Sequence, residues 1–85
     1  MKNFTSGIIH NNHFLQLYFH SVENNVGFYY YVTAVTQDAE RISFDLKMDV
    51  KGNWNVVAPA PLWIRHLELQ FNQLLNEHFR YKMVG

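Results

Sequence analysis

The chain has 85 residues, with seven Lys plus Arg, seven Asp plus Glu, no Cys and a formal net charge of +0. This length predicts a single domain of residues 1–85, and the missing Cys excludes disulfides and thiolate metal sites. Proteins that bind nucleic acids usually carry a basic surplus that neutralises phosphates. The balanced charge therefore argues against a nucleic-acid partner.

No apolar stretch approaches the roughly 20 residues that span a bilayer, so we expect no membrane partner. The opening Met-Lys-Asn-Phe-Thr-Ser-Gly also lacks the apolar run of a signal peptide. Together these features predict a cytoplasmic protein.

The first thirteen residues fit more than one interpretation. Residues 7–10, Gly-Ile-Ile-His, could form a short edge strand. Asn11-Asn12 then resembles a turn, because Asn tolerates positive φ angles. Whether this segment is a strand stays open at this point.

Four further segments are rich in strand-forming residues. The clearest is Arg41–Val50, in which five apolar residues alternate with five polar ones. Such alternation is typical of a strand with one buried face and one wet face. The predicted strands are residues 14–22, 28–36, 41–50 and 54–58, with turns at Asn24-Asn25 and at residues 51–53.

The pattern changes after residues 59–61, Pro-Ala-Pro. Proline cannot donate to a strand ladder but fits the first turn of a helix. From residue 61 to about residue 80, apolar residues recur at a helical period. The predicted apolar stripe consists of Ile64, Leu67, Phe71, Leu74 and Leu75, and Arg65, Asn72, Gln73, Asn76 and Arg80 are expected on the opposite, solvent side.

Turn lengths predict the strand pairing. A two-residue turn at Asn24-Asn25 would pair Phe19 with Tyr30, Leu17 with Val32 and Leu15 with Ala34. A three-residue turn at 51–53 would pair Val50 with Trp54, Met48 with Val56 and Leu46 with Ala58. These pairings predict one inner face that comprises Leu15, Leu17, Phe19, Phe28, Tyr30, Val32, Ile42, Phe44, Leu46, Met48, Val50, Trp54 and Val56.

The predicted fold is therefore α+β. An antiparallel meander of four strands, or five with the N-terminal strand, carries one C-terminal helix packed across one face.

The opposite face of the sheet is the candidate functional surface. Under the first two confident strands it carries aromatic side chains, and a single helix leaves nothing to cover them. Exposed apolar patches on small proteins usually have a purpose, and Tyr suits partly wet interfaces. The candidate interface or ligand-binding residues are Phe14, Tyr18, His20, Tyr29, Tyr31 and Val35.

Three functions follow, in decreasing order of support. The first is a non-enzymatic interaction module that acts as a homodimer through this aromatic surface. The second is small-molecule or peptide binding at Tyr18, His20, Tyr29 and Tyr31. The third is a minor enzyme or a metal site at His10 and His13, which are three residues apart. No sequence motif indicates a catalytic residue or a cofactor, and no carboxylate adjoins the two histidines in sequence.

Overall fold

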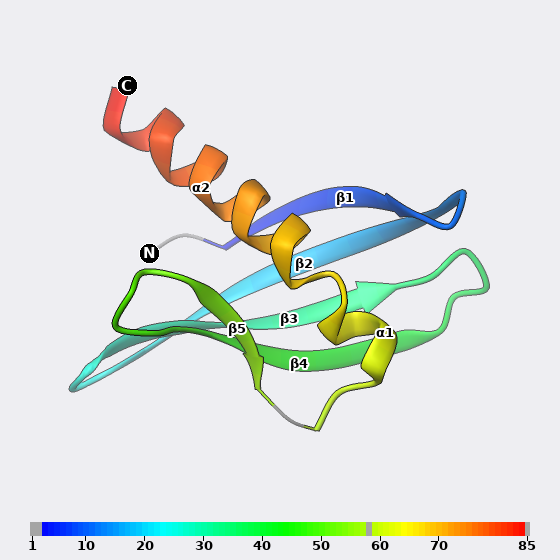
Figure 1. The fold of residues 1–85 in the computed structure, drawn as a ribbon, viewed down its shortest axis with the longest axis horizontal. Coiled ribbons are helices and arrows are strands. Elements are labelled where there is room, and N and C mark those ends of the chain that lie inside the picture. Colours follow the sequence, from blue (N-terminus) through cyan, green and yellow to red (C-terminus); the bar gives the residue numbers. More distant parts are fainter. Residues whose placement is uncertain (1–2, 58, 85) are drawn as a thin grey trace.

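The computed structural model describes residues 3–57 and 59–84, with side chains as far as residue 80. Within these residues the chain forms five strands and two helices (Figure 1). The strands make one antiparallel sheet in sequence order. The elements are β1 (Phe4–His10), β2 (His13–Asn24), β3 (Gly27–Val35), β4 (Arg41–Met48), β5 (Trp54–Val57), α1 (Leu62–Arg65) and α2 (Glu68–Val84).

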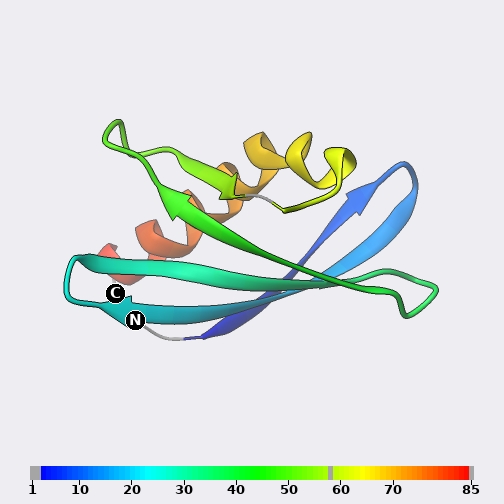
Figure 2. The same ribbon diagram turned by 90° about the horizontal axis from the view of Figure 1, so that it is seen from below.

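The architecture is an α+β meander, which confirms the predicted fold class. Both helices lie on one side of a strongly twisted sheet, and no described segment lies on the other side (Figure 2). The N-terminal strand is real and spans Phe4–His10, so it is longer than the predicted residues 7–10. Its turn is also confirmed, because Asn11 and Asn12 both have positive φ, at 50° and 63°. Two such residues define the type I′ turn that matches the twist of a hairpin.

The β2–β3 turn lies one residue later than predicted, at residues 25–26. The side-chain oxygen of Asn24 accepts a hydrogen bond from the backbone N–H of Val26 (2.9 Å), so Asn24 ends the strand instead of forming the turn. Because the pairing shifts by two residues, every side chain keeps its predicted face. The predicted pairs Phe19–Tyr30 and Leu17–Val32 are wrong, and the observed pairs are Phe19–Val32 and Leu17–Ala34.

Strand β4 ends at Met48, two residues earlier than predicted, because Asp49 begins a turn. Asp49 Oδ1 accepts hydrogen bonds from the backbone N–H groups of Lys51 (2.9 Å) and Asn53 (3.0 Å). Its Oδ2 accepts another from Nδ2 of Asn55 (3.0 Å). The bond from the Asn53 backbone, followed by that from Asn55, lowers the pKa of the Asp49 carboxyl below its ordinary value of 3.8.

This turn removes two residues from the predicted inner face. Val50 lies in the turn and is fully exposed, and Met48, the last residue of β4, is 50% exposed. The observed pairs are Met48–Trp54 and Leu46–Val56 in place of Val50–Trp54 and Met48–Val56. The predicted Leu46–Ala58 pair is excluded by the pairing of Leu46, and residue 58 itself lies outside the described residues.

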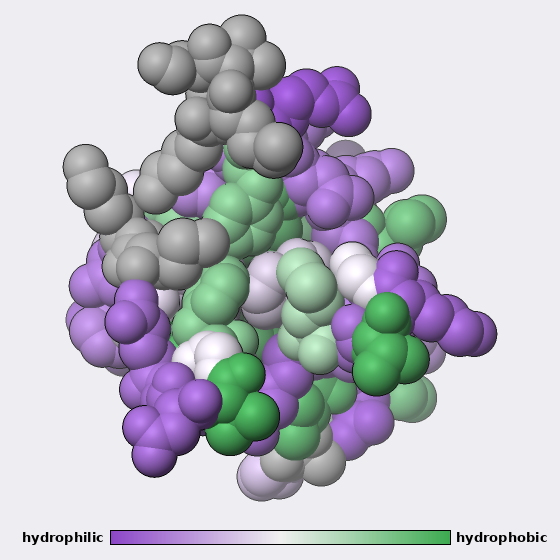
Figure 3. All heavy atoms as spheres, turned by 90° about the vertical axis from the view of Figure 1, so that its left-hand side faces the viewer, coloured by the Kyte–Doolittle hydropathy of each residue, from purple (hydrophilic) through white to green (hydrophobic). Residues whose placement is uncertain are grey.

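The turns at one end of the sheet carry isolated apolar side chains. Val26, in the β2–β3 turn, is 96% exposed, like Val50 in the β4–β5 turn. Seen from the end of the molecule where these turns lie, separate green side chains stand among purple ones (Figure 3). Single exposed apolar residues of this kind are ordinary and do not indicate a site.

The predicted single helix is broken into α1 and α2. The backbone N–H of Leu67 donates to the carbonyl of Ile64, three residues back, at 3.0 Å. This bond tightens the chain at His66, between the two helices. Ile64, before the break, and Leu67, after it, are both buried in the same core. The break therefore lets both helices pack on the sheet.

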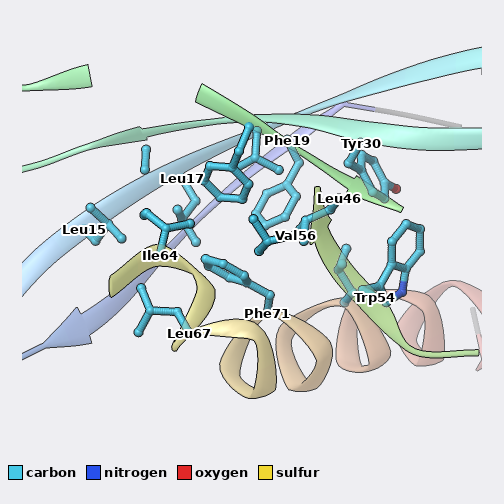
Figure 4. Close-up of a cluster of buried hydrophobic side chains, with 14 residues drawn as sticks. Leu15, Leu17, Phe19, Tyr30, Leu46, Trp54, Val56, Ile64, Leu67 and Phe71 are labelled. Carbon is cyan, nitrogen blue, oxygen red and sulfur yellow. The ribbon is translucent and has the colours of Figure 1, made fainter. Parts of the chain in front are cut away.

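The core lies between the inner face of the sheet and the helices (Figure 4). Phe44 of β4 stacks on Phe71 of α2, with ring centroids 5.5 Å apart. Of the predicted inner residues, Phe28, Ile42 and Leu74 are only partly buried. The buried residues are Leu15, Leu17, Phe19, Tyr30, Val32, Ala34, Phe44, Leu46, Trp54, Val56, Ile64, Leu67, Phe71 and Leu75.

The prediction that Asn72 faces solvent is wrong. Its Oδ1 accepts a hydrogen bond from the backbone N–H of Trp54 (2.6 Å), and its Nδ2 donates to the carbonyl of the same residue (2.8 Å). Nδ2 also donates to the carbonyl of Glu68 (2.8 Å) within α2. Asn72 therefore joins α2 to the outer edge of β5. Its side-chain amide makes the two hydrogen bonds that a neighbouring strand would otherwise make with Trp54.

Candidate interaction surface

The six candidate residues occupy the face of the sheet turned away from the helices, here called the aromatic face (Phe14, Tyr18, His20, Tyr29, Tyr31 and Val35). Alternation along β2 and β3 sends their side chains to this side, because the intervening residues fill the core. Three of the rings are well exposed, namely Phe14 at 44%, Tyr18 at 48% and Tyr31 at 44%. His20 is also exposed, whereas Tyr29 and Val35 are half-buried.

Cross-strand pairing brings some of these residues together. His20 on β2 lies directly opposite Tyr31 on β3. Tyr18 lies two residues along β2 from His20, and Tyr29 lies two residues along β3 from Tyr31, so four aromatic side chains occupy neighbouring rows. Side chains on one face of adjacent strands in such rows are close enough to contact one another. Tyr18, His20, Tyr29 and Tyr31 therefore form the centre of the aromatic face.

Phe14 and Val35 lie apart from this centre. Val35 pairs with the polar Gln16, which separates Phe14 from Tyr18 along β2. The ring of Phe14 instead lies over Gly7 on β1, so closely that a Cβ atom at residue 7 would clash with Cζ of Phe14. A larger residue at position 7 would require the Phe14 ring to move aside.

Strand β1 enlarges the surface beyond the prediction. Ile9 is 60% exposed and lies opposite Phe14 on the aromatic side of the sheet. Sequence reasoning missed Ile9 and Gly7 because it left the N-terminal strand open. The positive-φ tendency of Asn11-Asn12 was the available signal, since a two-residue turn fixes the register of the strand before it.

The half of this face formed by β4 is polar. Thr33 and Ser43 share a hydrogen bond between their hydroxyl oxygens (3.1 Å). The ammonium group of Lys47 lies 4.9 Å from the centre of the Tyr29 ring. Cation–π contacts of this kind are favourable even at exposed sites. The aromatic centre thus borders a polar strip with Asp45, which lies opposite Tyr31.

A shallow pocket of about 220 Å³ lies at the other end of the sheet. The β1–β2 and β3–β4 turns meet there, so His10 and His13 come beside the loop of residues 36–40, and His13 Nδ1 lies 2.8 Å from Gln37 Oε1. The His10 ring stacks on Trp63 of α1, with centroids 5.6 Å apart. Sequence reasoning missed this grouping, although turns that alternate in a meander necessarily meet at the same end.

No carboxylate adjoins His10 or His13 in the sequence, but the fold brings two carboxylates into the same pocket as these histidines. Asp38 and Glu40 line it together with His10 and His13. Within the described residues, however, no three His, Asp or Glu side chains are arranged to hold a metal ion. Carboxylates beside aromatic rings suit organic cations, but both carboxylates are exposed and one face of His10 is already covered by Trp63. The pocket is therefore a weaker candidate than the aromatic face.

A second shallow cavity, of about 200 Å³, touches the aromatic face at one residue. It is lined by Tyr29 and Lys47 and by the β2–β3 turn, and it does not reach Tyr18, His20 or Tyr31. Of the four residues at the centre of the aromatic face, only Tyr29 lines either cavity. An open surface of this kind suits a broad partner better than a small molecule, which usually binds in a concave site.

Neither described helix is long and apolar enough to cross a membrane. Comparison with known proteins gives no match, whether to a family model, to a curated protein or to a solved structure.

Proposed function

We propose that the chain is a small non-enzymatic binding module that associates as a homodimer through the aromatic face. The observation that carries this proposal is the uncovered side of the sheet, where Phe14, Tyr18 and Tyr31 are each 44–48% exposed. Tyrosine and other aromatic residues are enriched in the cores of protein interfaces. A cluster of them on an open sheet face is costly to leave in water.

A second copy is the partner that this surface fits best. A two-fold axis uses the same patch on both subunits, so the His20–Tyr31 centre of one copy would meet that of the other. The net charge of +0 gives no long-range repulsion between copies.

The size of the face supports the same partner. The five strands have four to twelve residues, eight on average, so with strands about 4.8 Å apart the face measures roughly 20 by 26 Å. With side chains raised above the sheet, its accessible surface is on the order of the 800 Å² per partner that a standard interface buries. Cytoplasmic residence, expected from the sequence, stays a prediction.

The test is the mass of the protein in solution. At micromolar concentration, light scattering after size exclusion should give about twice the 10.1 kDa of one chain. Tyr31→Glu should return the mass to that of one chain without unfolding it, because an unpaired charge would be buried at the interface centre.

Val26→Glu is the matched control. It adds the same charge at an apolar residue that is 96% exposed and lies in a turn outside the aromatic face, so the dimer should persist. A wild-type chain that remains one subunit at high concentration would refute the proposal. Equal dissociation by both variants would show that net charge, and not the aromatic face, controls association.

A further inference from the structure

The two edges of the sheet differ in how far they are already occupied. On β5 the N–H and the C=O of Trp54 both bond to Asn72 of α2. Strand β5 has only four residues, so Val57, the residue after Val56, is already its last. Natural proteins often cover a sheet edge because its free backbone groups can pair with another chain. The β5 edge is protected in this way.

Within the part of the chain that the structure describes, no side chain bonds to the outward backbone groups of β1, at the opposite edge. Its two-residue turn closes on the His10–His13 pair, and such a closing pair exchanges both backbone hydrogen bonds. Hydrogen-bonded pairs alternate along an antiparallel ladder, so Thr5, Gly7 and Ile9 direct their N–H and C=O groups away from β2. The strand, Phe-Thr-Ser-Gly-Ile-Ile-His, contains no Lys, Asp, Glu, Arg or Pro. It therefore lacks the residues that usually block an edge.

A groove of about 330 Å³ runs beside this open edge. One wall is β1 from Ser6 to Ile9, and the other is the side of α2 formed by Gln70, Gln73, Leu74 and Glu77. Near one end of β1, the ring of His78 on α2 stacks on Phe4 with centroids 3.8 Å apart. A groove between an edge strand and a helix is the setting in which several peptide-binding domains add a strand to their sheet.

We propose that this groove binds an extended peptide of another protein, which pairs with β1 as a sixth strand. The backbone groups of Thr5, Gly7 and Ile9 would supply the hydrogen bonds. Every second peptide side chain would then face α2 beside Leu74, so the peptide should carry uncharged apolar residues at alternate positions. A Lys or Arg in place of one of these alternate residues would complement Glu77, the charged residue of the groove. This surface is separate from the aromatic face, so the inference does not depend on the proposed dimer.

The charge of the groove disfavours a second copy of β1 as the occupant. Pairing two copies about Gly7 would bring both grooves, and so both Glu77 carboxylates, to the same axis. Strand β1 has no cation to offer them. Like charges brought together in this way oppose association.

The experiment uses a synthetic peptide, acetyl-Thr-Val-Thr-Lys-Thr-Val-Thr-amide, titrated into the ¹⁵N-labelled full chain; its two Val and its Lys alternate with Thr and therefore share the face turned to α2. We expect the backbone amides of Thr5, Gly7 and Ile9 to shift together with those of Gln73 and Glu77. The same peptide with an N-methyl group on every residue keeps its side chains but has no N–H group left at either edge, so it cannot pair as a strand. It should bind at least about tenfold more weakly. Replacing this Lys by Glu should weaken binding about two- to fivefold, as expected for an exposed ion pair with Glu77.

Two variants of one residue test the protein side. Ile9→Pro removes an N–H that points to the free edge, so β1 should still pair with β2 while peptide binding is lost. Ile9→Thr changes the side chain but keeps this N–H, and should retain binding. Retained dispersion of the remaining amide signals checks the fold of each variant, and the N-methylated peptide decides the question if Ile9→Pro does not fold.

Three outcomes would overturn the proposal. Equal binding of the N-methylated peptide would mean that no strand is added, and unshifted β1 amides at millimolar peptide would mean that the edge is not a site. Shifts of the β1 amides with protein concentration alone would identify a second copy as the occupant. Repeating the titration on the Tyr31→Glu chain separates this result from any failure of the dimer, because that variant alters only the aromatic face.

Discussion

Tyr30 shows how a single residue can combine strong packing with an unpaired polar atom. Its side chain is fully buried, and its ring meets Phe19 and Phe28 edge to face at 5.7 and 5.6 Å. Its hydroxyl has no hydrogen-bond partner within the described part of the chain. Burial raises the pKa of this hydroxyl above its ordinary value of 10.0. A buried hydroxyl without a partner costs about 1–3 kcal/mol, so the ring and not the oxygen accounts for the value of this residue to the core.

Tyr30→Phe should therefore stabilise the protein. Removing the unpaired oxygen while keeping the ring should raise the free energy of unfolding by about 0.5–2 kcal/mol, measured by urea denaturation. Tyr18→Phe, which removes a hydroxyl from a residue that is 48% exposed, is the control and should change it by less than about 0.5 kcal/mol. A loss of stability in Tyr30→Phe would show that the hydroxyl is bonded after all.

The β4–β5 hairpin depends on a carboxylate, and this makes its stability sensitive to acid. The folded state lowers the pKa of Asp49 through bonds from Asn53, Asn55 and Lys51. A group whose pKa is lowered on folding adds stability above its unfolded pKa. That contribution is lost as the pH falls through the folded pKa.

Asp49→Asn tests this dependence. The amide oxygen can still accept from the backbone, but its Nδ2 cannot accept from Asn55. Melting temperatures of wild type and variant should differ by a constant amount from about pH 7 to 5, and should converge below about pH 4 as the wild-type carboxyl is protonated. A difference that persists at about pH 2 would contradict the assignment to the carboxylate charge.

At the level of elements, the sequence predicts faces better than registers. Alternation with period two placed Leu17, Phe19 and Phe44 in the core correctly, whatever their partners. Both hairpins were nevertheless shifted by two residues, because such a shift leaves every face unchanged and the pattern cannot detect it. Turn chemistry decided the register instead, through the side chains of Asn24 and Asp49. Helical spacing likewise found Ile64 and Leu67 but not the tight turn that separates them.

At the level of the whole molecule, one side of the sheet depends entirely on the segment after residue 60. Ending the chain there would expose the inner face from Leu15 to Val56 to water. We expect the shortened chain to be insoluble or molten, with poorly dispersed amide signals and increased binding of a hydrophobic dye.

Two leucines of α2 provide a matched comparison in the full chain. Leu75 is fully buried and Leu69 is 71% exposed, so Leu75→Gln should unfold or strongly destabilise the protein and Leu69→Gln should not. A shortened chain with sharp, dispersed signals would contradict the packing of the helices on the sheet.

The candidate sites show the same limit on a larger scale. The alternation of side chains along each strand was enough to place Tyr18 and Tyr31 on the uncovered face. It could not show that Phe14 turns over Gly7 or that His10 meets Trp63, because these contacts join elements whose relative placement the pattern does not encode. The groove beside β1 depends on the position of α2 relative to an edge strand that the sequence left open.

The amide of Asn72 also determines how far a sheet of this kind can grow. A subunit with two reactive edges behaves as a bifunctional monomer, and strand addition can then propagate without limit into a fibre. By occupying both backbone groups of Trp54, Asn72 makes the β5 edge less reactive in edge pairing than the β1 edge. In the polymer chemist's sense it acts as a chain terminator at the β5 end of the sheet. In a chain without net charge to keep copies apart, we expect this one side chain to oppose edge-to-edge assembly at β5.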